Sequence, residues 1–308
     1  MSALPVSNLP TAPADTFTRS RGLHNATARI MNNIIVVACY ASALFTILAL
    51  LLIFGYIAFR GISSIDLAFF TELPPHGMRN CIAGSLVLIA LASCLGVPLG
   101  MLCGIYLAEY AGDTWFSHAI RLVVDVLAGV PSILVGVLAY ELVVVPMAGG
   151  TAWAGAVALG FMMCPIIART TEEMLKLVPH ALREASIGLG ASKFQTLFRI
   201  VIPAGASGII TGIMLAVARV AGETAPLLFT VMGSDQKVFS IDSTFPYFHA
   251  DLNHQFPSLT VKIYQYAISP SADGIRQMWA ALFILILLVL ILNICVRIAS
   301  NRGALKGH

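Results

Sequence analysis

The sequence has 308 residues, of which 58% are hydrophobic and only 11% charged, and its formal net charge is +3 at pH 7. A soluble domain carries roughly a quarter charged residues, so this composition excludes an ordinary soluble globular protein. The small positive charge is not gathered into a basic block or interleaved with aromatic residues, which argues against a nucleic-acid-binding protein.

Apolar segments long enough to cross a bilayer recur along the chain, since about 20 residues suffice. The pair Gly149–Gly150 offers a turn between two of them. We therefore predict an all-α membrane protein with six transmembrane helices, in the segments 34–59, 81–108, 122–141, 142–168, 207–232 and 277–296.

The ends of the chain and its cysteines carry weaker signals. Residues 1–33 are polar and too long for the first part of a signal peptide, so we predict a flexible leader followed by a retained first span. The six cysteines show no CxxC spacing and no clustering with histidine. We expect them to be small buried hydrophobic residues rather than disulfides or metal ligands, and we expect neither a metal site nor a catalytic residue.

Lysine and arginine are distributed unevenly between the two sides of this six-helix arrangement. Twelve lie on the side of the N-terminus and five on the opposite side, which predicts cytoplasmic N- and C-termini. The core of 81–296 then has a cytoplasmic loop at 169–203 and an outer loop at 233–276, and residues 297–308 form a cytoplasmic tail.

The cytoplasmic loop carries clear local signals. Pro179 suits the first turn of a helix that runs through Ala185 until Gly188 and Gly190 stop it. Ser192 with Gln195 three residues later predicts a capping box that opens a second helix. Its apolar stripe suits either docking of a soluble partner or a helix lying at the membrane interface, and periodicity leaves both open; the stripe is Phe194, Leu197, Phe198 and Val201.

An arginine stands within the fifth apolar segment. Arg219 lies twelve residues after Ser207 and thirteen before Met232, so a continuous helix would place it near the bilayer midplane. A lone arginine there costs from about 3 to more than 10 kcal/mol, so it needs a counter-charge or water. Glu223, one helical turn later, supplies the counter-charge.

Gly222 and Pro226 predict irregular helix geometry beside this pair, with freed backbone groups facing a cavity rather than lipid. A guanidinium group matches phosphate and carboxylate oxygens in two-point geometry, which favours an anion site. The alternative is that Arg219 and Glu223 only hold helices together.

The cytoplasmic loop resembles the EAA loop of ABC importer permeases. The matching residues are Glu184, Ala185 and Ser186, then Gly190, and finally Ile200, Ile202 and Pro203, with Ser186 and Ile202 as mild departures. The resemblance implies the type I ABC importer permease fold, in which the segment from Glu184 to Gly190 docks on an ATPase subunit. It also implies that ATP and Mg belong to that partner; no GxxxxGK[ST] motif occurs in this sequence, and we expect this chain to bind no cofactor.

The stretch RVAGETAPLLFT, together with YQYAISP near the end, resembles the phosphate-importer permeases of the PstA and PstC families, PstA more closely. The resemblance implies import of inorganic phosphate across the bacterial inner membrane, with Arg219, Glu223 and Thr224 on the substrate path. The implied partners are a PstC-like permease, a PstB-like ATPase dimer, and a PstS-like periplasmic phosphate-binding protein. The alternatives are an importer of another oxyanion, such as molybdate or sulfate, and an ion-coupled secondary transporter or membrane-bound enzyme.

Overall fold

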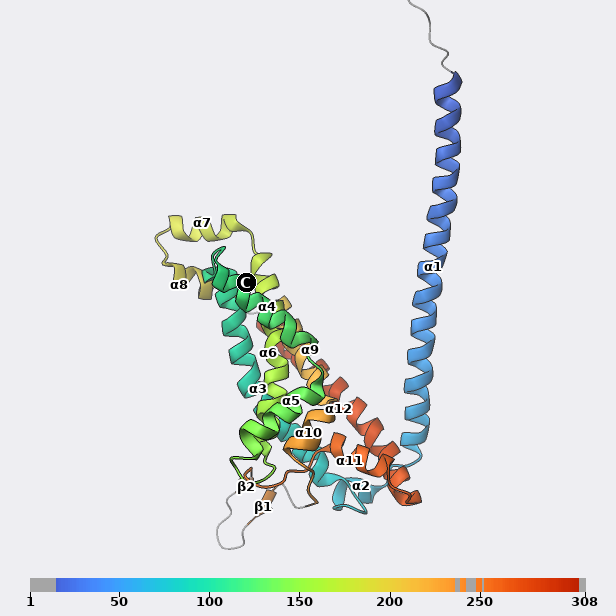
Figure 1. Ribbon diagram of the computed structural model, residues 1–308, viewed down its shortest axis with the longest axis vertical. Helices are drawn as coiled ribbons and strands as arrows, with labels where there is room; N and C mark the ends of the chain where they lie inside the picture. Colours follow the sequence, from blue (N-terminus) through green and yellow to red (C-terminus); the bar gives the residue numbers. More distant parts are fainter. Residues whose placement is uncertain (1–14, 236–238, 242–247, 251, 305–308) are drawn as a thin grey trace, which may run out of the picture. The chain divides into compact units, whose positions relative to one another are not determined.

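The computed structural model describes residues 15–235, 239–241, 248–250 and 252–304 (Figure 1). The chain divides into two compact units, residues 1–57 and 58–308, and each is described by itself. The first unit contributes most of α1 (Asp15–Ile62), whose apolar part from Ala28 is long enough to span a membrane. It includes the predicted first span, and the helix extends back to Asp15, into the segment predicted as a leader. Residues 1–14 of that segment lie outside the described residues.

Four long helices build the second unit: α3 (Arg79–Ile105), α6 (Ala152–Lys176), α9 (Ile202–Ala221) and α12 (Ala272–Ala304). The core surrounds α6, where Leu159 and Met163 pack with Leu88 of α3 and Val220 of α9. Among the described residues five helices are long and apolar enough to cross a membrane, or six if one bent pair counts as a single span. The prediction of a six-span, all-α protein is therefore confirmed.

The bent pair differs from the predicted third span. The helices α4 (Trp115–Gly129) and α5 (Ser132–Ala139), the latter continued by the π-helical turn η2 (Tyr140–Val144), meet at 103°. The third span predicted over 122–141 is therefore divided at Pro131, which lacks a backbone N–H and interrupts the helix. The fourth span also begins later than predicted, at Ala152, where the Thr151 hydroxyl caps the N–H of Ala154 at 3.1 Å.

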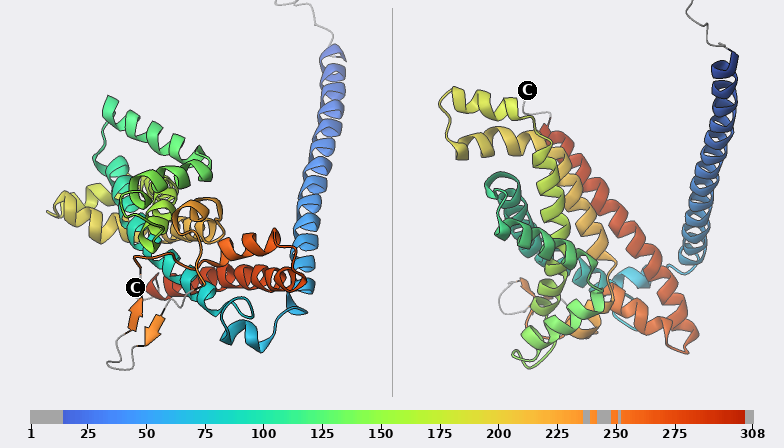
Figure 2. Two further views of the ribbon diagram at one scale, coloured as in Figure 1. Left: turned by 60° about the horizontal axis from the view of Figure 1, so that its bottom comes forward. Right: turned by 45° about the horizontal axis from the view of Figure 1, so that its top comes forward.

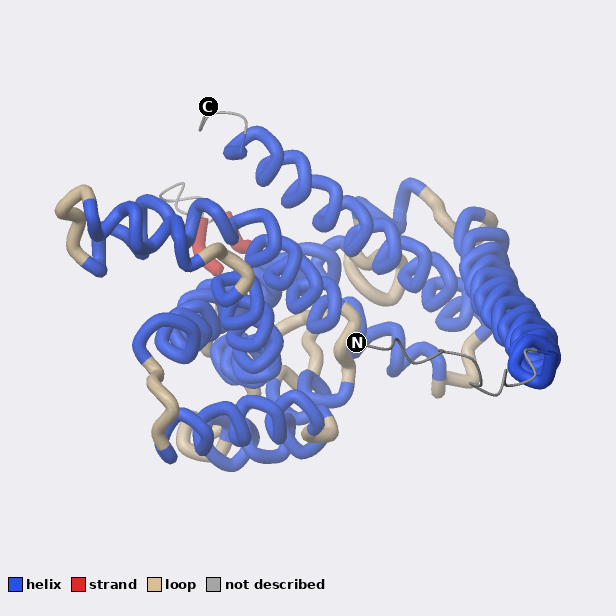
Figure 3. The backbone as a smooth tube through the Cα atoms, turned by 90° about the horizontal axis from the view of Figure 1, so that it is seen from above, coloured by secondary structure: helices blue, strands red, loops and turns tan. Residues whose placement is uncertain are grey.

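The fifth apolar segment is broken as well. After α9 ends at Ala221, the short helix α10 (Ala225–Thr230) follows, so the predicted span over 207–232 consists of two helices. Beyond it lie the strands β1 (Phe239–Ile241) and β2 (Phe248–Ala250), which pair antiparallel with Ser240 opposite His249, and then the helix α11 (Leu259–Ala267). Figure 3 shows how small this hairpin is beside the helices.

The short elements gather at two opposite ends of the second unit. The helices α7 (His180–Gly188) and α8 (Lys193–Thr196) lie at one end, and α2 (Leu67–Thr71), α11 and the hairpin lie at the other (Figure 1). Figure 2 shows that α12 ends on the side of α7. The loop predicted as cytoplasmic and the end of the last span therefore share one side of the molecule, as the six-span topology requires.

Candidate functional site

The helix break after α9 is the centre of the candidate site. Gly222 terminates the helix with φ −95° and ψ −1°, and the N–H of Glu223 donates to the carbonyl of Val220 at 3.1 Å. Pro226 stands in the first turn of α10, where the missing N–H of proline is tolerated. The sequence prediction of irregular backbone at Gly222 and Pro226 is thus confirmed, although the break is a full separation into two helices.

Hydroxyl groups bond to the backbone both at this break and at the start of α11, which packs beside it. The Thr260 hydroxyl donates to the carbonyl of Glu223 at 3.1 Å, and the Ser258 and Thr260 hydroxyl oxygens lie 3.0 Å apart. The N–H of Leu259, at the start of α11, donates to Oγ of Ser85 on α3 at 2.8 Å. Because an unsatisfied backbone group in an apolar interior costs several kcal/mol, the Thr260 hydroxyl stabilises the non-helical segment and the Ser85 hydroxyl stabilises the start of α11.

Arg219 lies in the last turn of α9 and not in the middle of a continuous helix. Its level in the bundle follows from its neighbours instead: it lines a small pocket with Phe161, Met162 and Ile166 of α6. Those residues stand near the middle of α6, which runs from Ala152 to Lys176. The arginine is therefore close to the midpoint of a spanning helix, as the sequence predicts, but it reaches that level because α9 ends there.

The pair formed by Arg219 and Glu223 is loose. Nη2 of Arg219 lies 3.8 Å from Oε1 of Glu223, which is too long for a hydrogen bond. The arginine side chain is 50% exposed and the glutamate side chain 18% exposed. In the described part of the chain no hydrogen bond engages the guanidinium group, so its donors remain available to an anion.

Thr224 occupies the N-cap position of α10 and its side chain makes no capping hydrogen bond. The structure thus brings the three predicted substrate-path residues together at one helix break. Their contact with substrate stays a prediction.

The loop between α6 and α9 has the predicted helix–turn–helix form. α7 ends in a Schellman motif, in which Gly190 adopts φ +87° and the N–H of Ala191 donates to the carbonyl of Ser186 at 3.2 Å. The capping box of Ser192 and Gln195 is present at the start of α8. The second helix differs from the prediction because α8 passes into a π-helical turn, η3 (Leu197–Val201), before α9 begins.

The four residues of the predicted ATPase-docking segment have two kinds of environment. Glu184, Ala185 and Gly190 are exposed, and nearby apolar side chains are exposed as well, with Leu189 at 90%. Ser186 is buried instead, and its Oγ lies 2.9 Å from Oγ1 of Thr196 on α8. Ser186 therefore joins the two short helices, while its neighbours present a free surface.

The sequence does not predict two clusters of ion pairs near this loop. Glu172 of α6, 1% exposed, lies within ion-pair distance of Arg121, Arg169 and Lys176. Glu109, after α3, accepts two hydrogen bonds from Arg183 of α7. The sequence signal for Arg183 was its position directly before Glu184, but nothing in the sequence paired it with a residue 74 positions away.

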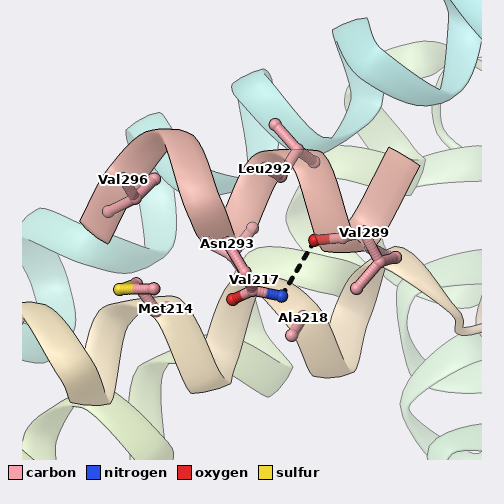
Figure 4. Close-up of a pocket in the computed structure, with 8 residues that line it drawn as sticks. Met214, Val217, Ala218, Val289, Leu292, Asn293 and Val296 are labelled. Atoms are coloured by element: carbon pink, nitrogen blue, oxygen red, sulfur yellow. Dashed lines mark hydrogen bonds between the residues drawn. The ribbon is translucent and has the colours of Figure 1, made fainter. Parts of the chain in front are cut away.

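A further groove separates α9 from α12 (Figure 4). Its lining is apolar except for Asn293, whose amide donates to the carbonyl of Val289 on its own helix at 2.9 Å. Among the described residues no group of three His, Cys, Asp or Glu side chains could hold a metal ion. The groove therefore adds no reactive group to the site at the helix break.

Comparison with known proteins gives a consistent result. Residues 96–302 match the family described as binding-protein-dependent transport system inner membrane component. The phosphate transport system permease protein PstA of Yersinia pestis is 41% identical over 92% of this chain and 94% of its own length. The protein of the same name from Haemophilus influenzae is 39% identical over 78% of this chain and 83% of its own length.

Solved structures share the fold. A chain of the MetNI methionine ABC transporter, in an inward facing conformation, matches 74% of this chain with a TM-score of 0.54 and 20% identity, and 96% of that chain is covered. A chain of a bacterial alginate ABC transporter, in complex with its alginate-bound periplasmic protein, matches 90% with a TM-score of 0.61 and 14% identity, and 98% of that chain is covered.

Proposed function

The chain belongs to the family of binding-protein-dependent transport system inner membrane components, within the PstA group of permeases, and from this membership we propose that it imports inorganic phosphate. It is a multi-pass membrane protein with the type I ABC importer permease fold. In the proposed function it forms half of a translocation pathway, a homologous PstC-like permease forms the other half, and a PstB-like ATPase dimer supplies the energy. ATP and Mg are bound by that ATPase, and this chain holds no cofactor.

The exposed guanidinium of Arg219 at mid-span level carries this proposal. A half-exposed arginine facing lipid at that depth would be costly, so it faces water or a partner subunit. Its planar group offers two parallel N–H donors to phosphate oxygens, and charge-assisted hydrogen bonds of this kind are about twice as strong as neutral ones. Arg219 therefore attracts the anion as it passes the break between α9 and α10.

Glu223 has a different part in the proposed mechanism. A carboxylate repels phosphate, so Glu223 supplies the counter-charge that an arginine at this depth needs and does not bind the substrate. The 3.8 Å separation fits that role, because the arginine stays near its counter-charge while its N–H groups remain unused. Thr224 lies beside the break and its hydroxyl makes no capping hydrogen bond, so it offers a neutral donor to the same anion.

The two ends of the second unit give the proposed orientation. The end with α7 and α8 faces the cytoplasm, where the exposed surface around Glu184, Ala185 and Gly190 receives the ATPase. The end with α11 and the hairpin faces the periplasm, where a PstS-like phosphate-binding protein delivers its anion. Both termini then lie in the cytoplasm of a bacterium with this protein in its inner membrane.

Uptake of radiolabelled phosphate by the assembled complex tests the proposal. Arg219→Gln should lower uptake about tenfold or more, because a hydrogen bond to a charged group contributes about 1.5–3 kcal/mol. Arg219→Lys, which keeps the charge and loses the two-point geometry, should fall between this variant and the wild type. The exposed Arg199→Gln serves as the control.

Unchanged uptake in the Arg219→Gln variant would remove this residue from the mechanism. Competition with excess sulfate or molybdate tests the substrate. If either anion blocks labelled phosphate uptake as well as unlabelled phosphate does, the importer serves another oxyanion.

A further inference from the structure

A π-helical turn, η1 (Tyr106–Tyr110), continues α3 at the end where α7 and α8 lie. Turns of this type are rare and occur frequently at functional sites. Three cationic side chains from three different elements bind to η1: Arg121 of α4, Arg183 of α7 and Lys193 of α8. The turn is thus the place where the loop and two spanning segments are joined by charged hydrogen bonds.

Arg183 makes the most extensive of these connections. Its Nη2 and Nε donate to Oε1 of Glu109 at 2.7 and 3.2 Å. The same side chain donates to the carbonyl of Leu175 at 2.7 Å and to that of Val178, at the end of α6. The two charged side chains are only 15% and 10% exposed. One arginine therefore joins α7 to the ends of both α6 and α3.

The other two cations hold the backbone of the same turn. Nζ of Lys193 donates to the carbonyl of Glu109 at 2.7 Å and lies 4.5 Å from the ring centroid of Tyr110. Nη2 of Arg121 donates to the carbonyl of Leu107 at 3.2 Å, while its Nε donates to Glu172 of α6 at 2.8 Å. Because carbonyl groups at a helix end lack partners within the helix, these contacts also stabilise the end of α3.

We propose that η1 is the element through which movement of the α7–α8 loop reaches α3 and α4. The ion pair of Arg183 and Glu109 keeps α7 in position against η1 and carries the movement. The inference rests on the proposed function, since it needs an ATPase that moves the loop. A largely enclosed charged pair is either made or broken, so it transmits a displacement in a discrete step. The exposed surface of α7 binds the partner, and the partly buried Arg183 on the same helix passes the movement on.

The test separates ATPase binding from coupling. The complex is reconstituted in liposomes, and three quantities are measured: captured ATPase, ATP hydrolysed, and phosphate transported. Arg183→Gln and Glu109→Gln should leave ATPase capture unchanged, because neither residue lies on the exposed surface of α7. Phosphate transported per ATP hydrolysed should fall about tenfold, in proportion to a lost charged hydrogen bond. The double variant should be no worse than the poorer single variant, since both act through one contact.

Two controls accompany these variants. Arg199→Gln removes an exposed positive charge from the same loop and should leave the ratio of phosphate to ATP unchanged. Arg183→Lys keeps the charge within the fold and should lower the ratio less than Arg183→Gln. If Arg183→Gln fails to accumulate in membranes, the lysine variant and Glu109→Gln still give the ratio.

Several outcomes would overturn the inference: an unchanged ratio, loss of ATPase capture together with transport, or additive losses in the double variant. Failure of the proposed function would look different. A wild-type complex that transports another anion allows the same ratio to be measured with that anion, and the inference is then judged on it. A wild-type chain that captures no ATPase overturns both.

Discussion

The backbone N–H of Leu259 donates a 2.8 Å hydrogen bond to Oγ of Ser85, a residue 174 positions earlier in the chain. This contact ties the start of α11 to α3 at the level of the helix break. Gly84 allows the approach, because a Cβ atom there would meet the carbonyl oxygen of Pro257. The environment of Glu223 thus depends on α3 as well as on its own segment.

Ser85→Ala should therefore destabilise the protein by about 1–3 kcal/mol, because the N–H of Leu259 is left unsatisfied in a buried place. Thermal unfolding in detergent measures the effect. Ser93→Ala is the matched control on the same helix, since the Ser93 hydroxyl only donates to the carbonyl of Ile89 one turn earlier. Equal shifts for the two variants would contradict a special role for Ser85.

Glu172→Ala should be among the most damaging single changes in the ionic cluster beside η1. The side chain is 1% exposed and Arg121, 22% exposed, donates to it at 2.8 Å, so its removal loses a charged hydrogen bond that contributes about 1.5–3 kcal/mol. Glu173→Ala, one residue later and 56% exposed, pairs with Arg169 at 3.2 Å and should cost less than about 1 kcal/mol. The yield of folded protein and its unfolding temperature report the difference, and similar losses for both variants would refute it.

Gly190→Ala should weaken the α7–α8 turn through backbone strain alone. The residue has φ +87°, and no atom lies within 4 Å of an added Cβ. The left-handed conformation costs an alanine about 1–2 kcal/mol. Gly188→Ala adds the same methyl group in equally open space without the positive φ and is the control. Capture of the ATPase should fall for the first variant only, and equal capture by both would show that the turn is not strained.

Glu223→Gln should lower the KM for phosphate, because it removes a negative charge from the path of an anion. Two unit charges about 4 Å apart interact by roughly 1 kcal/mol even in water, which corresponds to about a fivefold change. The carboxylate makes no hydrogen bond to Arg219 at 3.8 Å, so the guanidinium keeps its donors in the variant. Initial rates of uptake across phosphate concentrations give KM. A raised KM would show instead that Glu223 binds the substrate or that Arg219 needs it for its position.

Much of this architecture is predictable from local sequence. The apolar runs are too long for anything but spanning helices, and Gly190, Ser192 and Gln195 determine a turn and a helix start whose partners lie within a few residues. Such signals work because the interactions behind them are local. Hydropathy does not show how far the third and fifth spans are divided, because it stays high across Pro131 and Gly222 although the backbone breaks there. Apolar composition reports burial or lipid contact and does not report helix continuity.

Local sequence is enough to show that the chain spans a membrane, that Arg219 and Glu223 stand within an apolar segment, and that Glu184 precedes a glycine turn. The packing of the helices establishes which groups these residues meet. It placed Arg219 at mid-span level through α6, gave the Glu223 carbonyl its donor from Thr260, and joined Arg183 to Glu109. Hydrogen bonds and ion pairs act over a few ångströms in space and carry no trace of sequence separation, so partners 37 or 74 positions apart become visible only after the helices have packed.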